Sequence, residues 1–315
     1  MGALADAQRR LSPTRMPPAP LRVRVKTSPL THRVLPRRLA VDRAVARGRT
    51  LWERNPAERD WALTMMRTIL AGTARAAESE TMARSALIER EVNKALFWQP
   101  WDTATMDETS SARVDEALSC GRHLLLSSCH LGPIFYSMSV ITSRGRSPYA
   151  VAGPWFFEPP TPDYWGRRIV RWWQGITERG EHLVPSVGCF PVLEKLLQAG
   201  EIVRIHFDLP GSRETPFLGK PVALATGTAR LAAATDALVL PMRARRDGHR
   251  VWTDIEEPLD TRDFGSAEAL HDALAATHER LILEIPFALE DPRRPGAWEE
   301  GATTSRWTRP RTRTA

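Results

Sequence analysis

Short apolar runs alternate with longer helix-like segments between residues 122 and 284, and this alternation constrains the fold more than any other feature of the chain. Each run is brief and largely aliphatic, which is typical of a buried strand. Strands that alternate with helical segments favour a mostly parallel or mixed sheet with helices on both faces. The predicted strands lie at 122–129, 149–153, 182–185, 202–207, 238–243 and 251–255, and the predicted fold class is α/β.

A helical pattern at residues 41–97 precedes the sheet. Its clearest start is Asn55-Pro56-Ala57-Glu58, which combines a capping residue, a proline at the first helical position and an early acid. Two apolar stripes follow it and predict an N-terminal helical hairpin: Trp61, Met65, Ile69 and Leu70 form the first, and Ala83, Leu87, Val92, Leu96 and Phe97 form the second. We therefore expect a disordered, basic, Pro/Arg-rich segment at 1–40, one α/β domain at 41–295 and a basic tail at 296–315.

The basic residues gather at the two ends of the chain. Residues 1–50 hold twelve Arg or Lys and two acids, and residues 302–315 hold four Arg and no acid. Because the whole chain has a net charge of +7, residues 51–301 carry −7. Arginine-rich ends favour phospholipid headgroups or nucleic-acid phosphates, unless they are simply solvated. No nucleic-acid-binding module is recognisable, so we expect no nucleic-acid partner.

Three further features favour a cytoplasmic location. No apolar run approaches the roughly 20 residues that span a bilayer. No secretory signal is visible at the N-terminus. Cys120, Cys129 and Cys189 lack metal-ligand spacing and cannot all pair, which favours a reducing compartment and predicts no metal site.

His130 is the main candidate for chemistry. It follows a predicted strand and precedes a predicted helix that opens at Gly132-Pro133 and runs to about residue 142. Ligands of open α/β sheets bind at the carboxyl ends of the strands, and histidine suits a general base near neutral pH. Backbone N–H groups near residues 131–134 would then form an oxyanion site at the helix start. The alternative is a structural histidine at a strand end.

Four sequence blocks give this candidate a family context. The first is Leu-Ser-Ser-Cys-His-Leu-Gly-Pro at 126–133, and the second is Asp208-Leu-Pro-Gly-Ser-Arg213. The third is Pro-Phe-Leu-Gly-Lys-Pro at 216–221 with Thr-Gly-Thr-Ala-Arg-Leu at 226–231, and the fourth is Leu-Val-Leu-Pro at 238–241. Over roughly residues 41–295 the chain resembles the lipid A lauroyl/myristoyl acyltransferases, a family of the lysophospholipid acyltransferase superfamily that also includes phosphatidylinositol mannoside acyltransferases.

The resemblance implies a glycerolipid-acyltransferase-like fold and fatty acyl transfer to a hydroxyl or amine of a lipid, glycolipid or lipid-like metabolite. His130 would be the general base, and no cofactor is implied beyond the donor, an acyl-CoA or an acylated carrier protein. Other candidate contacts with donor or substrate are Ser128, Gly132, Arg213 and Lys220. Arg213 is assigned to a phosphate, because its guanidinium matches phosphate geometry, or alternatively to a surface salt bridge. The implied location is the inner face of the plasma membrane, bound peripherally to its anionic surface.

Two departures from the family pattern leave a second function open. The family places Glu or Asp five residues after the histidine, where this chain has Phe135, and no arginine stands near Gly153. A carboxylate beside such a histidine fixes its tautomer and stabilises the imidazolium. Asp208 is our first replacement and Glu158 the second, although Asp208 also suits an Asx turn. If neither replaces it, the chain is a catalytically degenerate partner of acyl carrier protein, lipid or an active acyltransferase.

A cluster of aromatic residues and arginines follows the second predicted strand. Such a mixture favours a membrane interface, an acyl-chain tunnel or a docking site for an acidic carrier protein. The alternative is an ordinary tryptophan-rich core with a solvated basic face. The residues are Trp155, Phe156, Phe157, Tyr164, Trp165, Trp172 and Trp173, with Arg167, Arg168 and Arg171.

Overall fold

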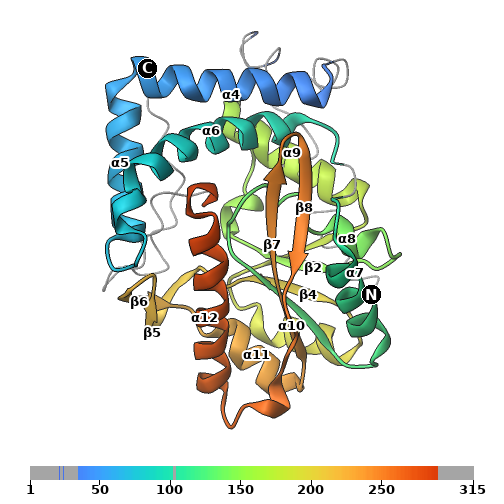
Figure 1. Ribbon diagram of the computed structural model, residues 1–315. Coiled ribbons are helices and arrows are strands. Elements are labelled where there is room, and N and C mark those ends of the chain that lie inside the picture. Colours follow the sequence, from blue (N-terminus) through green and yellow to red (C-terminus); the bar gives the residue numbers. More distant parts are fainter. Residues whose placement is uncertain (1–20, 22–23, 25–34, 102–103, 290–315) are drawn as a thin grey trace.

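A computed structural model describes residues 35–101 and 104–289, together with Leu21 and Arg24. Most of the expected segment 1–40 and all of the expected tail 296–315 lie outside the described residues. The first long helix begins at Arg37, four residues before the boundary that we expected. In the described residues the fold is α/β, as predicted, with one twisted main sheet between layers of helices (Figure 1).

The main sheet has the order β3-β2-β4-β1-β7-β8, with β9 paired to β7. The ladders from β3 to β7 are parallel, and β7 pairs with β8 and β9 in antiparallel fashion. Two further strands pair with each other in an antiparallel hairpin outside the main sheet. The main strands are β1 (Leu124–Ser128), β2 (Tyr149–Ala152), β3 (His182–Pro185), β4 (Val203–His206), β7 (Leu238–Asp247), β8 (Arg250–Ile255) and β9 (Leu259–Asp260), and the hairpin is β5 (Pro210–Phe217) and β6 (Lys220–Leu224).

Helices cover the sheet on both faces. The N-terminal layer holds three long helices where we predicted a hairpin, and it crosses the top and left of the view in Figure 1. The helices are α4 (Arg37–Arg54), α5 (Pro56–Leu70), α6 (Ser79–Trp98), α7 (Glu108–Ser119), α8 (Ser139–Thr142), α9 (Tyr164–Glu178), α10 (Phe190–Gln198), α11 (Gly227–Thr235) and α12 (Ala267–Glu284), and the 3₁₀ turns are η1 (Ala76–Glu78), η2 (Pro154–Phe156), η3 (Thr261–Asp263) and η4 (Pro286–Ala288). No described helix has the length and apolar character needed to cross a membrane.

Local sequence explains how the helical layer packs. Asn55 caps α5, because its side chain accepts a hydrogen bond from the N–H of Glu58 at 3.3 Å. Gly48 lets α4 approach α6 closely, since a Cβ at that position would meet the Cα of Ile88 at 2.6 Å. The predicted cap at Asn55 is therefore confirmed.

The alternation of side chains along the strands sorts the core into two layers. Leu125 of β1 and Val203 of β4 point to the layer that contains α5, α10, α11 and α12. Leu124 and Leu126 point to the opposite layer, which contains Phe135 and residues of α4, α6 and α7. Both faces of the central strands are therefore buried, as the near-continuous apolar run at residues 124–126 predicted.

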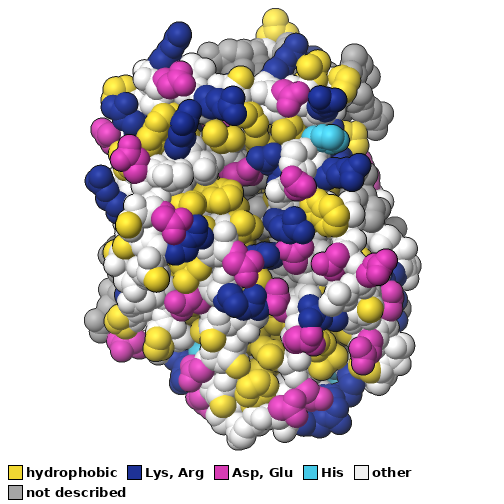
Figure 2. All heavy atoms as spheres, viewed as in Figure 1, with side chains coloured by type: hydrophobic (Ala, Val, Ile, Leu, Met, Phe, Trp, Pro, Cys, Tyr) yellow, Lys and Arg dark blue, Asp and Glu magenta, His cyan; other side chains and the backbone are white. Residues whose placement is uncertain are grey.

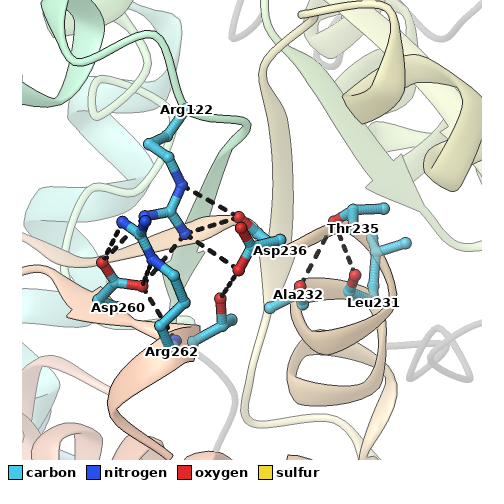
Figure 3. Close-up of polar contacts among 8 residues, drawn as sticks. Arg122, Leu231, Ala232, Thr235, Asp236, Asp260 and Arg262 are labelled. Atoms are coloured by element: carbon cyan, nitrogen blue, oxygen red, sulfur yellow. Dashed lines mark hydrogen bonds and ion pairs between the residues drawn. The ribbon is translucent and has the colours of Figure 1, made fainter.

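An arginine anchors the amino end of β1, opposite to the end that carries His130. Arg122 donates to the backbone carbonyl of Asp236 at 2.7 Å and to the carboxylate of Asp260 at 2.9 Å (Figure 3). Asp236 ends α11 in the left-handed conformation, with φ 51°. This contact ties the start of β1 to the end of α11 and to β9.

Candidate active site

His130 and Asp208 meet because β1 and β4 are neighbouring parallel strands. Ser128 at the end of β1 is directly opposite His206 at the end of β4. His130 and Asp208 each stand two residues beyond this pair, at the carboxyl edge of the sheet. The sequence order of the two strands, together with their parallel pairing, is therefore enough to place the two side chains side by side.

The two side chains form a histidine–aspartate dyad. The Nδ1 atom of His130 lies 2.8 Å from Oδ1 of Asp208, and the backbone N–H of His130 donates to Oδ2 at 3.1 Å. Asp208 is fully buried, whereas 18% of the His130 side chain is exposed. A carboxylate accepts hydrogen bonds only, so Nδ1 carries the proton and Nε2 is the basic nitrogen. Asp208 holds both the backbone and the ring of His130 in place.

Phe135 does not face this dyad. Its ring packs edge-on against Phe97 at 5.2 Å between centroids and tilted against Trp101 at 5.3 Å, and 1% of the residue is exposed. The position that carries a carboxylate in the resembled family is therefore part of an aromatic core here. Asp208 contacts His130 instead, and Glu158, our second candidate, lies exposed after η2.

The prediction of a helix that opens at Gly132-Pro133 is wrong. Gly132 has φ 68°, and the segment that follows is a series of turns before the four-residue helix α8. The N–H of Gly132 donates to the carbonyl of Ala288 at 2.8 Å, and the N–H of Ile134 donates to the carbonyl of Gly132. Leu131 also forms a bridge with Leu289. These N–H groups are engaged in the fold and do not form the predicted helix-start oxyanion site.

Gly132 nevertheless has a clear reason to be glycine. A Cβ added there would meet the carbonyl oxygen of Ala244 at 2.1 Å, and its positive φ disfavours other residues. The glycine thus lets the turn after His130 lie against β7. Contact of Gly132 with a substrate stays a prediction.

Sequence reasoning missed a second histidine in the site. The ring of His206 lies on the ring of His130, with 3.7 Å between centroids and 32° between planes. Arg204 donates from Nη2 to Nε2 of His206 at 2.8 Å. Ser128, which we assigned to donor or substrate binding, is 2% exposed, and its hydroxyl lies 3.2 Å from Nδ1 of His206. The sequence does contain a signal for it: Arg204 and His206 stand at alternate positions of β4, which is otherwise apolar.

The other two predicted binding residues lie in ion pairs or helix contacts. Arg213 of β5 donates to both carboxylate oxygens of Asp272 on α12, at 3.0 and 3.1 Å. Lys220 of β6 donates to the carbonyl of Thr68 at 3.3 Å. For Arg213 this is the salt bridge that we gave as the alternative to phosphate binding. No described contact brings either residue to the dyad.

Of the aromatic residues near α9, one is buried and the others are partly buried against the core. Trp173 is 2% exposed, and Trp172 packs edge-on against Trp101 at 5.2 Å. The arginines lie against rings as well: Arg171 is 4.5 Å from the Trp101 centroid, and Arg168 is 4.4 Å from that of Phe97. This arrangement corresponds to the core alternative of our sequence analysis, and its arginines do not form a solvated basic face.

Buried ionisable groups surround the dyad on both sides. On the α12 side, burial lowers the pKa of His278 to about 4, while the nearby Asp208 acts in the opposite direction. Nε2 of His278 lies 2.8 Å from the hydroxyl of Ser127. On the other side, burial raises the pKa of Glu181, and the positive charges of Arg179 and Arg204 oppose that rise.

His130, His206 and Asp208 also have the residue types of a metal site, with ligand atoms within 4.8 Å of one another. Metal ligands must direct their lone pairs at a common point. Here Nδ1 of His130 is paired with Asp208, and Arg204 brings a positive charge and donates to Nε2 of His206. The arrangement fits a histidine–aspartate dyad better than a cation site.

One cavity of about 700 Å³ is lined by residues near α12 and contains neither member of the dyad. Its lining residues are Arg75, Ala276, Glu279, Arg280, Leu283 and Glu284. This cavity therefore does not provide a site for an acyl chain beside His130.

Comparison with known proteins found likeness among solved structures. No protein-family model and no curated protein matches the chain. The chain is similar to the crystal structure of PlsC, the 1-acyl-sn-glycerophosphate (LPA) acyltransferase from Thermotoga maritima. The two sequences are 16% identical, the match covers 79% of this chain and 96% of that chain, and the TM-score is 0.40. This likeness is too distant to carry a conclusion about activity.

Proposed function

We propose that the chain is an acyltransferase that moves a fatty acyl group from an acyl thioester to a hydroxyl or amine of a lipid, glycolipid or lipid-like metabolite. The observation that carries the proposal is the buried Asp208 carboxylate, 2.8 Å from Nδ1 of the part-exposed His130. The sequence blocks around His130, Asp208 and residues 216–231 supply the reaction class through their resemblance to lipid A acyltransferases.

The dyad can perform both proton transfers of this reaction. Nε2 of His130 takes the proton of the acceptor hydroxyl or amine while the acceptor atom bonds to the thioester carbonyl carbon. Asp208 stabilises the imidazolium that forms. When the tetrahedral intermediate collapses, the carbon–sulfur bond breaks and His130 returns the proton to the leaving thiolate. Atoms and charges balance, and the enzyme ends in its starting state.

Donor and location follow from the same resemblance. The donor is an acyl-CoA or an acylated carrier protein, and the acceptor lies at the anionic inner surface of the plasma membrane, where the protein binds peripherally. Arg213 and Lys220 belong to this proposal as secondary contacts, and Arg213 would have to exchange Asp272 for a phosphate. No further cofactor is required by the dyad chemistry.

Acyl-transfer assays with a long-chain acyl-CoA or acylated carrier protein test the proposal, with a lysophospholipid or glycolipid as acceptor. We expect wild type to form acylated product and His130→Ala to form none. Asp208→Asn keeps the shape but replaces an acceptor oxygen with a donor amide group, which favours the wrong tautomer of His130, and should lower kcat by about 10⁴-fold, the loss seen for the equivalent change in a hydrolase triad. His249→Ala is the matched control, because His249 is exposed and belongs to the β7–β8 turn.

The catalytically degenerate partner is the competing outcome. It would show binding of acylated carrier protein or lipid by wild type without turnover, and equal behaviour of wild type and His130→Ala. The Asp208 carboxylate beside Nδ1 of His130 argues against this alternative, which we inferred from the lack of a carboxylate at Phe135.

A further inference from the structure

A second imidazole lies face to face with the proposed base. The rings of His130 and His206 are 3.7 Å apart at their centroids and tilted by 32°. His206 is the last residue of β4, two residues before Asp208. One strand end therefore supplies both the carboxylate at the edge of the His130 ring and the aromatic surface under its face.

The contacts of His206 decide its protonation. A guanidinium has donors and no acceptor, so Nε2 of His206 must accept the 2.8 Å hydrogen bond from Arg204. The proton of the neutral ring then lies on Nδ1, which donates to the hydroxyl oxygen of Ser128 at 3.2 Å. Arg204 also reaches that oxygen from Nε, at 3.4 Å. Arg204 and Ser128 thus hold the ring at both nitrogens.

The charge that fixes His206 is itself held inside the fold. Arg204 is 4% exposed and lies on the same face of the sheet as Leu126, its partner in register on β1. The buried carboxyl group of Glu181 feels the positive charge of Arg204, which favours its ionised form against the effect of burial. A second proton on His206 would displace the Arg204 hydrogen bond and bring two cations into contact in a low-dielectric site.

We infer that His206 is a positioning residue for His130, a neutral stacking surface locked by Arg204 and Ser128 that holds the His130 ring in the plane of its bond to Asp208. A neutral ring in this place does not repel the imidazolium that His130 becomes after it takes a proton, whereas a protonated one would. The catalytic part of this inference rests on the proposed acyl transfer, but the geometry of the two rings does not.

The first measurement reads the protonation of the rings without any substrate. In protein with ¹⁵N-labelled histidine, long-range ¹H–¹⁵N correlations at neutral pH should show His206 protonated at Nδ1 and not at Nε2. In Arg204→Met this fixed tautomer should be lost. Because Arg204 is buried, a second variant, Arg204→Met with Glu181→Gln, removes both charges together. An Nε2–H tautomer of His206 in folded wild type overturns the inference.

The second measurement separates stacking from a merely structural role. His206→Phe keeps an aromatic face under His130, and His206→Ala removes it. The Nδ1–H proton of His130 should exchange slowly with water in wild type and His206→Phe, and much faster in His206→Ala. Equal exchange in the alanine and phenylalanine variants overturns the inference. Arg122→Met is the control, since it removes an arginine from the other end of β1 and should leave this proton unchanged (Figure 3).

Turnover is the third measurement, and it distinguishes the acyltransferase proposal from the positioning role of His206. His206→Ala should lower kcat by about 10- to 100-fold with little change in KM, the size of effect seen when an outer partner of a metal-bound histidine is removed, and His206→Phe should recover most of it. If wild type turns nothing over but the exchange pattern holds, the acyltransferase proposal fails and the positioning of His130 stands. Turnover equal to wild type in His206→Ala overturns the catalytic part.

Discussion

Asp208 supplies the carboxylate that contacts His130, whereas Phe135 supplies none. It is fully buried and contacts both the ring and the backbone N–H of His130. A carboxylate is costly to bury unless hydrogen bonds satisfy it, and these two bonds contribute to that requirement. The dyad therefore depends on two strands that meet at the sheet edge, and no spacing along one segment of the chain encodes it.

Phe135→Glu tests this conclusion at the position of the family's carboxylate. The new side chain would enter the aromatic cluster around Phe97 and Trp101, so it should not reach Nδ1 of His130 or raise turnover. We expect a loss of about 2–4 kcal/mol in the free energy of unfolding, because aromatic packing is lost. Arg179, which donates to the backbone carbonyl of Phe135 at 2.6 Å, offsets only part of the buried charge.

Urea unfolding and the acyl-transfer assay, run on the same preparation, measure both effects. Phe135→Leu is the matched control, since it shortens the side chain without adding charge and should cost less. A Phe135→Glu variant with greater turnover than wild type would show that the position still communicates with His130.

The sequence predicted the strands more closely than the turn after β1. Alternation and short aliphatic runs placed β1, β3 and β4 within two residues of their observed bounds, because burial on both faces leaves a local pattern. Gly132-Pro133 also looks like a helix start, yet contacts with β7 and η4 impose a turn there. Those contacts join segments more than 100 residues apart, and no local pattern records them.

The lack of a local pattern for long-range contacts also explains which part of the site could be predicted. His130 and Asp208 both follow parallel strands, so their meeting could be predicted from strand order. The stack of His206 on His130 depends on the exact register that sets Ser128 opposite His206. A shift of one residue would turn Arg204 and His206 to the other face of the sheet.

The anchor of β1 yields a prediction about elements. Arg122→Met removes hydrogen bonds to the end of α11 and to Asp260, and should lower the free energy of unfolding by about 1–2 kcal/mol (Figure 3). The loss stays moderate because Arg262 also holds Asp260, through bonds of 2.8 and 3.1 Å. Turnover should not change, because the dyad is at the opposite end of β1.

Chemical denaturation of Arg122→Met and Arg262→Met compares the contributions of two arginines that bind the same carboxylate, that of Asp260. The Arg262 side chain is 60% exposed and the Arg122 side chain 16%, so Arg262→Met should cost less than about 0.5 kcal/mol. Equal losses in the two variants would mean that the burial of Arg122 contributes nothing.

At the scale of the molecule, charged side chains of both signs are mixed on the surface, and ionisable histidines are buried inside. Figure 2 shows Lys and Arg interspersed with Asp and Glu over the visible face. Inside, the described core keeps several histidines: His278 stacks on Phe207 at 5.0 Å, and His271 packs on the same ring at 5.1 Å. Burial lowers the pKa of both histidines. They couple the stability of the whole fold to pH.

The sign of that coupling follows from the proton uptake of the two states. The pKa of His278 is about 4 in the folded protein and 6.5 as its ordinary value, so between these pH values the unfolded chain binds more protons. Stability from this residue is intact above about pH 6.5 and falls as the pH is lowered to 4, by about 3 kcal/mol in total. His271 adds a loss of the same sign.

Urea unfolding of wild type and His278→Gln at a series of pH values from 4 to 7 measures this loss directly. Glutamine can keep a hydrogen bond to Ser127 but cannot take up a proton, so the variant should lose less stability than wild type on acidification. The variant starts lower at pH 7 because the stack on Phe207 is gone, and the two curves should converge toward pH 4. The exposed His249→Gln should follow wild type. Parallel curves for His278→Gln and wild type would show that His278 does not titrate between the two states, and that the acid sensitivity of the fold comes from its carboxylates.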